Sequence, residues 1–456
     1  MALKIYNTLS RSVEPFKSIT PEKVGMYVCG VTVYDDCHIG HGRTFIAFDV
    51  ARRWLQESGY DVKFVRNVTD VDDKIIKRAA ERKILPSELA ETYTKRMQED
   101  LGELGCLPPS VEPRATQYIP KMLALIEKLE EKGYAYQDKN GDVDFSVRKF
   151  KPYGALSGKK VDELQPGERV RVEEAKQDPL DFALWKRAKP GEPEWDSKWG
   201  KGRPGWHIEC SVMSKKYLGE QIDIHAGGED LIFPHHENEI AQSEAANGKT
   251  FANYWMHNGF LNIDNKKMSK SLGNFFTVRE IGEKYDLQVL RFFMLSAHYR
   301  SPINFSAELM EASKNGLERI ITCAERLKEL LNKVSGDALT EEEQENKKNV
   351  DELVAKFEAA MDDDFNTADA VSAIFELVKL ANSTANEEST RAYAELLAGT
   401  IAKLSDVLGI ITERKAEVLD SEVEELIAAR QQARKEKNFA LADEIRQKLL
   451  DMGIVL

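Results

Sequence analysis

The sequence predicts an α/β fold in which a parallel sheet, interrupted by a mixed insertion, is followed by a mostly α-helical C-terminal region. Three observations lead to this fold class. A strand–helix–strand pattern occupies the first 70 residues, a strand–loop–helix pattern begins near residue 222, and apolar residues recur at helical spacing beyond about residue 300. With 456 residues, the chain is long enough for several domains.

The first pattern predicts one strand–helix–strand unit. Two β-rich runs, 24–28 and 62–68, flank apolar residues that recur at helical spacing from Phe45 to Leu55, and Gly59 ends this helix. Two strands joined in this way form a right-handed crossover in a parallel sheet, which binds ligands at the carboxyl ends of its strands. The residues that follow these strands are therefore the first candidates for a functional site.

The middle of the chain has a different texture. Between about 115 and 195, aromatic, lysine and glycine residues mix with turns at 140–141 and 166–167, which predicts a mixed insertion rather than a continuation of the sheet. A second α/β stretch follows, with a strand at 222–225. A helix is expected from Pro234 to Ala246, because proline is well suited to a first helical turn.

The C-terminal part is expected to be helical. An apolar stripe runs along 317–331, the segments 350–380 and 391–408 show the same period, and two final helices at 423–437 and 439–450 predict a helical hairpin. The expected domains are 1–115 and 196–260 for the two halves of the sheet domain, 116–195 for the insertion, 261–310 for a segment with a lysine-rich loop, 311–410 for a helical bundle, and 411–456 for a small helical region.

Charge and cysteine usage narrow the function classes. The chain has 64 Lys and Arg against 77 Asp and Glu, a net charge of −13, which argues against a generic nucleic-acid binder. Residues 335–365 alone contribute −8, whereas 260–300 carry a local +3. Five widely spaced cysteines form no disulfide framework, and no signal core or membrane span is evident, so a cytoplasmic protein is expected.

Two short motifs point to phosphate chemistry. His38, Gly40 and His41 lie at a strand-to-helix junction, where free N–H groups and the helix dipole favour a phosphate; the plainer interpretation is a polar helix cap. The lysine-rich run 266–271, with Lys267 and Lys270, suits a loop that closes over anionic groups, or simply a solvated basic loop. A P-loop is excluded, because Ser243 stands where its first glycine belongs.

A third constellation could hold a metal. Two thiolates, one imidazole and one carboxylate, from Cys29, Cys210, His235 and Glu239, form a plausible zinc set, although the spacing alone is a poor signal. His235 and Glu239 are four residues apart on an expected helix and so share a face. Taken singly, each cysteine is more commonly a small buried hydrophobe, and we keep that interpretation for Cys37, Cys106 and Cys323.

Together these motifs resemble the class I aminoacyl-tRNA synthetases, and within them the cysteinyl-tRNA synthetase family. The resemblance covers most of the chain, in family order, and is carried by residues 27–35, 38–41, 66–70, 203–211, 233–240, 267–271 and 361–367. It implies a Rossmann-like catalytic domain, a tRNA-stem contact in 261–310 and a C-terminal region that binds the anticodon. Two departures are the charged Glu229 in the loop 227–230, whose role stays open, and an expected abbreviation of the C-terminus.

The resemblance also implies roles for individual residues. The four residues of the third constellation would bind one Zn²⁺ per chain that takes the thiolate of the substrate L-cysteine, with Trp206 closing the side-chain pocket. His38 and His41 would hold ATP phosphates, Lys267 and Lys270 would stabilise the departing pyrophosphate, and Mg²⁺ would accompany ATP. Further contacts to ATP or the adenylate are expected from Thr32, Gly40, Asn67, Thr69, Gly228, Asp230 and Lys270.

Three functions remain open at this point. The first is two-step charging of tRNA(Cys) by a monomer that binds no membrane. The second is ATP-dependent ligation of cysteine to a small amine, as in the mycothiol pathway, and the third is a non-catalytic protein that binds zinc and RNA. The long region after residue 300, and basic residues in the final hairpin, favour the first.

Overall fold

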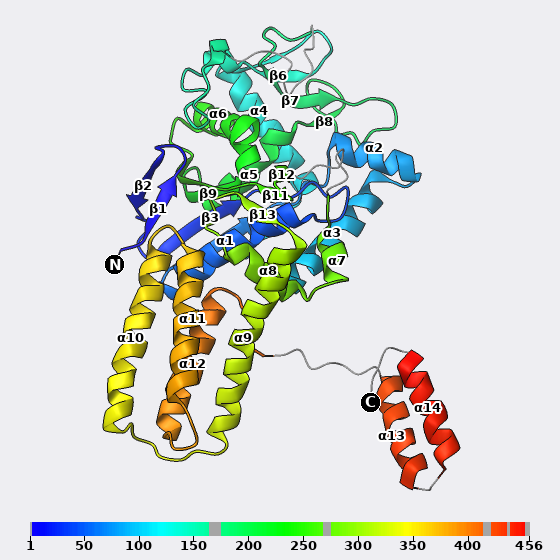
Figure 1. Ribbon diagram of the computed structural model, residues 1–456. Coiled ribbons are helices and arrows are strands. Elements are labelled where there is room, and N and C mark those ends of the chain that lie inside the picture. Colours follow the sequence, from blue (N-terminus) through cyan, green and yellow to red (C-terminus); the bar gives the residue numbers. More distant parts are fainter. Residues whose placement is uncertain (1, 164–174, 268–274, 414–420, 436–437, 452–456) are drawn as a thin grey trace. The chain divides into compact units, whose positions relative to one another are not determined.

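The computed structural model describes residues 2–163, 175–267, 275–413, 421–435 and 438–451. The chain divides into two compact units, Met1–Thr412 and Glu413–Leu456. The first contains every strand in the described residues and most of the helices, and the second is a pair of helices (Figure 1).

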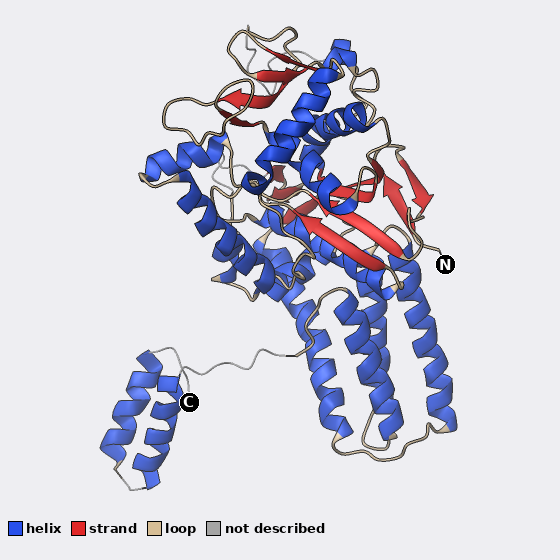
Figure 2. Cartoon of the chain, turned by 180° about the vertical axis from the view of Figure 1, so that it is seen from behind, coloured by secondary structure: helices blue, strands red, loops and turns tan. Residues whose placement is uncertain are grey.

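A four-stranded parallel sheet forms the centre of the first unit. Its strands are β3 (Lys23–Val28), β4 (Asp61–Arg66), β9 (Ile222–Gly228) and β10 (Ala252–Asn258), in the order β10-β9-β3-β4. The long helix α1 (Ile39–Glu57) connects β3 to β4, and helices cover the sheet (Figure 2). This confirms the predicted α/β fold and its first strand–helix–strand unit. The carboxyl ends of the strands place Cys29, Asn67 and Gly228 along one edge.

An antiparallel sheet forms the core of the insertion. Its strands β5 (Ala135–Gln137), β6 (Val143–Phe145), β7 (Phe182–Arg187) and β8 (Gly202–Pro204) pair in chain order, and helix α4 (Ile119–Glu131) precedes them. The sheet extends beyond residue 195 because β8 pairs with β7, with Trp185 opposite Pro204. β8 leads directly into α5 (Trp206–Leu218), which returns the chain to the parallel sheet.

Smaller elements complete the first unit. A hairpin of β1 (Lys4–Asn7) and β2 (Ser12–Pro15) starts the chain, and α2 (Asp73–Arg82) and α3 (Pro86–Glu103) follow β4. A third sheet has the order β12-β11-β13, with β11 (Leu261–Ile263), β12 (Lys266–Lys267) and β13 (Ile303–Phe305), and α7 (Val278–Gly282) and α8 (Leu287–Leu295) lie between its last two strands. Short turns of helix occur at Ala115–Tyr118, Val147–Lys149, Val161–Glu163, Glu229–Leu231 and Ile232–His236.

The predicted start of the helix at Pro234 is wrong. Helix α6 runs from Glu237 to Asn247, after the irregular turn Ile232–His236. Phe233 has extended backbone angles (φ −140°, ψ 130°), as expected for a residue that precedes proline, because the proline ring disfavours the helical region for its predecessor. His235 therefore lies in the turn, and only Glu239 lies in the helix.

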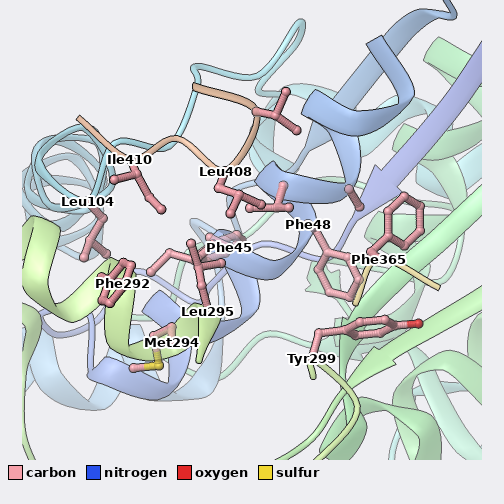
Figure 3. Packing of buried hydrophobic residues seen from close by; sticks show 14 of the residues in the cluster. Phe45, Phe48, Leu104, Phe292, Met294, Leu295, Tyr299, Phe365, Leu408 and Ile410 are labelled. Atoms are coloured by element: carbon pink, nitrogen blue, oxygen red, sulfur yellow. The ribbon is translucent and has the colours of Figure 1, made fainter. Parts of the chain in front are cut away.

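Four long helices form a bundle beside the parallel sheet: α9 (Ala307–Leu331), α10 (Glu341–Asp362), α11 (Thr367–Thr384) and α12 (Arg391–Val407). The periodic segment predicted at 350–380 is broken here, because Asp364 and Phe365 adopt left-handed backbone angles between α10 and α11. The bundle shares one hydrophobic core with α1 and α8, in which Phe45, Phe292 and Leu408 meet (Figure 3).

The second unit is the predicted helical hairpin. Helices α13 (Ser421–Lys435) and α14 (Phe439–Asp451) pack through Leu426, Ile427, Ile445 and Leu449. Among the described residues of the whole chain, no helix is long and apolar enough to cross a membrane.

Candidate active site and metal centre

Four potential metal ligands meet beside the carboxyl end of β3. Cys29 follows β3, Cys210 lies in α5, His235 lies in the turn before α6, and Glu239 lies in α6. Cys29 Sγ is 3.9 Å from Cys210 Sγ and 3.5 Å from Glu239 Oε1, and His235 Nε2 is 3.0 Å from the same oxygen. All four side chains are buried, so residues 181 positions apart in the sequence converge in a dry pocket.

The donor set matches what zinc requires. Ligand atoms around a tetrahedral Zn²⁺ lie about 3.3–3.8 Å apart, given bonds of about 2.0–2.3 Å. The separations of 3.9, 3.5 and 3.0 Å are close to that range. Two sulfur donors, one imidazole and one carboxylate also form a combination that suits this metal. The residues present therefore fit a zinc ion.

Histidines that the sequence analysis did not assign surround this cluster. His225 Nε2 lies 2.7 Å from Glu239 Oε2, and His207 Nδ1 lies 2.9 Å from His235 Nδ1. His236 Nε2 is 3.3 Å from Cys29 Sγ, and its Nδ1 is 2.8 Å from His257 Nε2. Cys29, His225, His236 and Glu239 even form a second set whose donor atoms lie within 4.8 Å of one another. The one signal available from sequence was a histidine, His225, at the end of the predicted strand 222–225.

The buried charges of the cluster compensate one another. Burial alone would raise the pKa of Glu239, but His225 and His235 lower it to about 2. Burial would lower the pKa of His235, yet Glu239 and Cys210 raise it to about 10. Burial and nearby imidazoles lower the pKa of His236 well below its usual value and that of His257 to about 3. The Glu239 carboxylate and the His235 imidazolium thus form a buried pair beside the neutral His236 and His257.

The two thiols behave as a pair. Burial raises the pKa of both sulfurs, and the hydrogen bond between them raises that of Cys29 further while it helps to lower that of Cys210 to about 6. His235 also lowers the pKa of Cys210. Cys210 is therefore the sulfur that loses its proton first, which suits a metal ligand, because thiolates rather than thiols bind metals.

Trp206 lies over this cluster. It opens helix α5, its ring centroid is 4.3 Å from that of His235, and 38% of its surface is exposed. An indole that is partly open to solvent and packed at a tilt against a candidate ligand side chain is well placed to cover a bound molecule.

The predicted adenylate contacts that follow β3 and β4 lie close to each other. Thr32 and Thr69 form a backbone bridge, and Asn67 Oδ1 accepts a 2.8 Å hydrogen bond from the Gly30 amide. Thr69 Oγ1 donates to the buried carboxyl group of Glu209, which neighbours Cys210. Gly30 is required here, because a Cβ on it would lie 1.6 Å from the Asn67 carbonyl oxygen.

The loop 227–230 closes the same edge of the sheet. Gly228 ends β9, and a Cβ on it would lie 2.5 Å from Asp230 Oδ1, so these two predicted contacts are neighbours. Glu229, whose role the sequence left open, accepts a 2.8 Å hydrogen bond from the Phe260 amide. It also acts on the buried Arg43, whose pKa burial lowers to about 10 while Glu229 raises it. In this structure Glu229 thus ties its loop to the segment that follows β10.

His38 and His41 are stacked at the N-terminus of α1, with ring centroids 3.5 Å apart. Each Nδ1 accepts a hydrogen bond from the other residue's backbone N–H, at 3.2 and 3.3 Å. The two residues therefore do cap the helix. Gly40 lies between them in the first turn, and this N-terminus opens a helix of 19 residues.

Of the lysine-rich loop, Lys270 lies outside the described residues, and Lys267 is described only as a backbone position in β12. The strand pairs with β11 in the small third sheet rather than in the parallel sheet. After the loop, the chain returns to the N-terminus of α1, where the Ile39 amide donates to the Phe276 carbonyl and His38 pairs with Thr277. The segment that follows the loop therefore lies against the histidine pair.

Comparison with known proteins identifies the family. Residues 15–315 match the model of the tRNA synthetases class I (C) catalytic domain, 356–412 match the DALR domain, and 416–456 match the cysteinyl-tRNA ligase anticodon binding domain. A cysteine–tRNA ligase of Lachnospira eligens is 58% identical over 461 residues, covering 100% of this chain and 98% of the relative. This chain belongs to the cysteinyl-tRNA ligase family.

Other comparisons agree with this membership. A cysteine–tRNA ligase of Clostridioides difficile is 56% identical and covers 100% of this chain and 97% of its own length. Among solved structures, methionyl-tRNA synthetase of Mycobacterium tuberculosis in complex with methionyl-adenylate has a TM-score of 0.63 at 15% identity, covering 92% of this chain and 96% of that one. At that identity, the similarity shows the fold alone, which is the Rossmann-like fold of class I synthetases.

In this member of the cysteinyl-tRNA ligase family, the structure groups the predicted site residues at one sheet edge. The metal set, Trp206, and the group Thr32, Asn67 and Thr69 are linked through Glu209 and His235, and Gly228 and Asp230 follow β9 on that edge. The buried cysteines Cys37 and Cys323 lie in the hydrophobic core, as predicted. Cys106 packs at the margin of that core.

Proposed function

We propose that this chain charges tRNA(Cys) with L-cysteine in two steps. The cysteine carboxylate attacks the α-phosphorus of ATP, which forms cysteinyl-adenylate as the bond to the β-phosphate breaks and pyrophosphate leaves. A hydroxyl of the 3′-terminal ribose then attacks the activated carbonyl carbon, and AMP leaves. The observation that carries this proposal is identity of 56–58% to cysteine–tRNA ligases over the whole chain, together with the buried Cys, Cys, His and Glu cluster.

We assign the recognition of cysteine to a zinc site formed by Cys29, Cys210, His235 and Glu239. When bound, zinc supplies a Lewis acid that prefers a thiolate to an alcohol, and so separates cysteine from serine, which differs from it by one atom. Shape alone distinguishes neighbours of this size by only about 1–3 kcal/mol. The four side chains hold the ion, and Trp206 covers the side chain of the bound substrate.

We assign the phosphate chemistry to the N-terminus of α1 and to the lysine-rich run 266–271. His38 and His41, at the positive end of a long helix, hold phosphate oxygens of ATP, which is expected with Mg²⁺. Lys267 and Lys270 stabilise the charge on the departing pyrophosphate. The contacts assigned to the adenylate are Thr32, Gly40, Asn67, Thr69, Gly228 and Asp230.

The match at 416–456 favours tRNA over a small amine as the acceptor. A cysteine ligase that acts on a small amine needs the metal and nucleotide sites but no anticodon-binding domain, whereas this chain matches such a domain in its second unit. We therefore propose tRNA(Cys) as the partner, bound by a monomer in the cytoplasm, where the five cysteines, none of which forms a disulfide, would stay reduced.

Pyrophosphate exchange into ATP and charging of tRNA(Cys) test the proposal together. We expect exchange that depends on cysteine and not on serine, and a Cys210→Ser variant that loses both zinc and this exchange. Cys323→Ser is the matched control, because Cys323 is equally buried but lies in α9.

Three possible results of this experiment would contradict different parts of the proposal. Full exchange after complete removal of zinc would contradict the metal assignment. Exchange without transfer to tRNA would support the small-amine ligase, and a complete lack of exchange would support the non-catalytic interpretation.

A further inference from the structure

Tyr27 lies beside the proposed metal ligands, and the proposed function gives it no role. It belongs to β3, two residues before Cys29, so both side chains leave the backbone on the same face of the sheet. Tyr27 is fully buried, and its ring centroid lies 5.2 Å from that of His225, its register partner on β9. Cys29 and Cys210 belong to the same apolar cluster as Tyr27.

The hydroxyl group of Tyr27 makes no well-formed hydrogen bond with any described group, although buried polar groups in proteins are normally hydrogen-bonded. Burial raises the pKa of Tyr27 well above its usual value, and Cys210 raises it further through its charge and through a side-chain hydrogen-bond interaction, as do the charges of Cys29 and Glu239. The buried phenol therefore faces sulfur and carboxylate acceptors.

Among the described residues, Cys210 is the sulfur that lacks a clear hydrogen-bond donor from outside the ligand set. His236 Nε2 lies 3.3 Å from Cys29 Sγ and can serve that sulfur. For Cys210 Sγ, the described residues offer no comparable donor outside the four ligands other than Tyr27, on which Cys210 acts more strongly than Cys29 or Glu239 does.

We propose that Tyr27 donates a hydrogen bond to the thiolate of Cys210 when zinc is bound, and so acts as a positioning residue for the metal centre. The proposal rests on the metal site of the proposed function. Bound zinc would keep Cys210 in its thiolate form, which is a much better hydrogen-bond acceptor than a thiol. The Tyr27 hydroxyl, which makes no well-formed hydrogen bond here, would then have a full acceptor, in the manner of other outer hydrogen bonds that orient metal ligands.

The test compares Tyr27→Phe with the wild-type chain in both metal states. Competition with a chelator should show a zinc affinity lower by about 10–100-fold in Tyr27→Phe, the usual cost of losing an outer hydrogen bond. The thermal stability of the zinc-free variant should equal or exceed that of the wild type, because the substitution removes an unpaired hydroxyl. With Co²⁺ in the site, the thiolate-to-metal charge-transfer band should shift to lower energy in the variant.

Tyr254→Phe is the matched control. Tyr254 lies on β10 of the same sheet and uses its hydroxyl to bond the Pro15 carbonyl and the Lys17 amide. This control should lower stability equally with and without zinc and leave zinc affinity unchanged. Normal zinc binding by the wild type with unchanged affinity in Tyr27→Phe would overturn this inference alone. A wild-type chain that binds no zinc would overturn the metal site and this inference together.

Discussion

Two buried carboxyl groups show how neighbours decide the charge of a side chain. Glu239 and Asp144 are both fully buried. Two histidines contact Glu239, and its pKa falls to about 2, so it stays ionised. Asp144, on β6 of the insertion, has Lys176 at 3.8 Å, and its carboxylate oxygens have no hydrogen-bond partner in the described residues. Burial therefore raises the pKa of Asp144 to about 7.

Asp144→Asn should stabilise the protein increasingly as the pH rises from about 4 to 7. The folded pKa of about 7 lies above the unfolded value, so the wild type loses stability as the pH rises from about 4 through 7. Asparagine resembles the protonated acid and cannot ionise. We expect little change in the free energy of unfolding near pH 4.5, and a gain that grows to about 2–4 kcal/mol above pH 8.

Denaturant titrations at several pH values would measure this difference. Asp162→Asn serves as the control, because the side chain of Asp162 is 88% exposed and should give no such dependence. A loss of stability for Asp144→Asn that is the same at pH 4.5 and pH 8.5 would show that Asp144 is ionised throughout, held by Lys176.

At the scale of elements, the corner between α10 and α11 joins the bundle to the sheet domain. Asp364, buried and in a left-handed conformation, accepts hydrogen bonds from the Tyr6 amide at 2.8 Å and the Tyr299 hydroxyl at 2.8 Å. Arg300 Nε lies 2.6 Å from its second oxygen. One carboxylate therefore holds β1 and the segment after α8 against the end of α10.

Asp364→Asn should destabilise the first unit by about 2–4 kcal/mol, because it leaves Arg300 without its counter-charge and weakens the bond to Tyr299. The neighbouring Asp363 is exposed, so Asp363→Asn should change stability by no more than about 0.5 kcal/mol. Chemical denaturation followed by near-UV circular dichroism would compare the two variants. Equal effects would mean that the corner is held by Phe365 and its apolar contacts instead.

The elements that sequence reasoning predicted are those with strong local periodicity. The strands at the centre of the sheet, α1 and the final hairpin were all predicted because apolar spacing is a local signal. The start of α6 was predicted wrongly, since the backbone of Phe233 is set by the proline after it. The break at Asp364 was missed because its left-handed backbone is stabilised by partners from residues 6, 299 and 300.

The candidate metal cluster was predicted, but not from a local sequence pattern. Donor chemistry made Cys29, Cys210, His235 and Glu239 a plausible zinc set, but only resemblance to a family singled them out, because 181 residues separate the two cysteines and spacing carries no information over that distance. The surrounding histidines come from two strands, one turn and one helix. Only the folded sheet brings them within hydrogen-bonding distance of one another.

At the scale of the whole molecule, the two units have separate hydrophobic cores. The metal cluster, the histidine pair of α1 and the predicted adenylate contacts all lie in Met1–Thr412. The second unit has its own small core and contains the segment that matches the anticodon-binding domain. Activation of cysteine and binding of the tRNA anticodon are therefore assigned to different units.

A chain that ends at Thr412 should retain cysteine activation and lose efficient charging. None of the groups assigned to the first step lies beyond Thr412, so pyrophosphate exchange should stay within about twofold of the full chain. Without α13 and α14, kcat/KM for tRNA(Cys) should fall by at least about tenfold, which corresponds to about 1.4 kcal/mol of lost binding. The fall should appear mainly in KM, because the acceptor end still reaches an intact site.

Charging assays on the truncated and full chains, with exchange measured in parallel, would decide this. Loss of exchange would show that the first unit depends on the second, and unchanged charging would show that the hairpin does not bind tRNA(Cys). Since most of the acidic excess lies in the bundle at 335–365 rather than in the hairpin, added salt should weaken charging by the full chain more than charging by the truncated one.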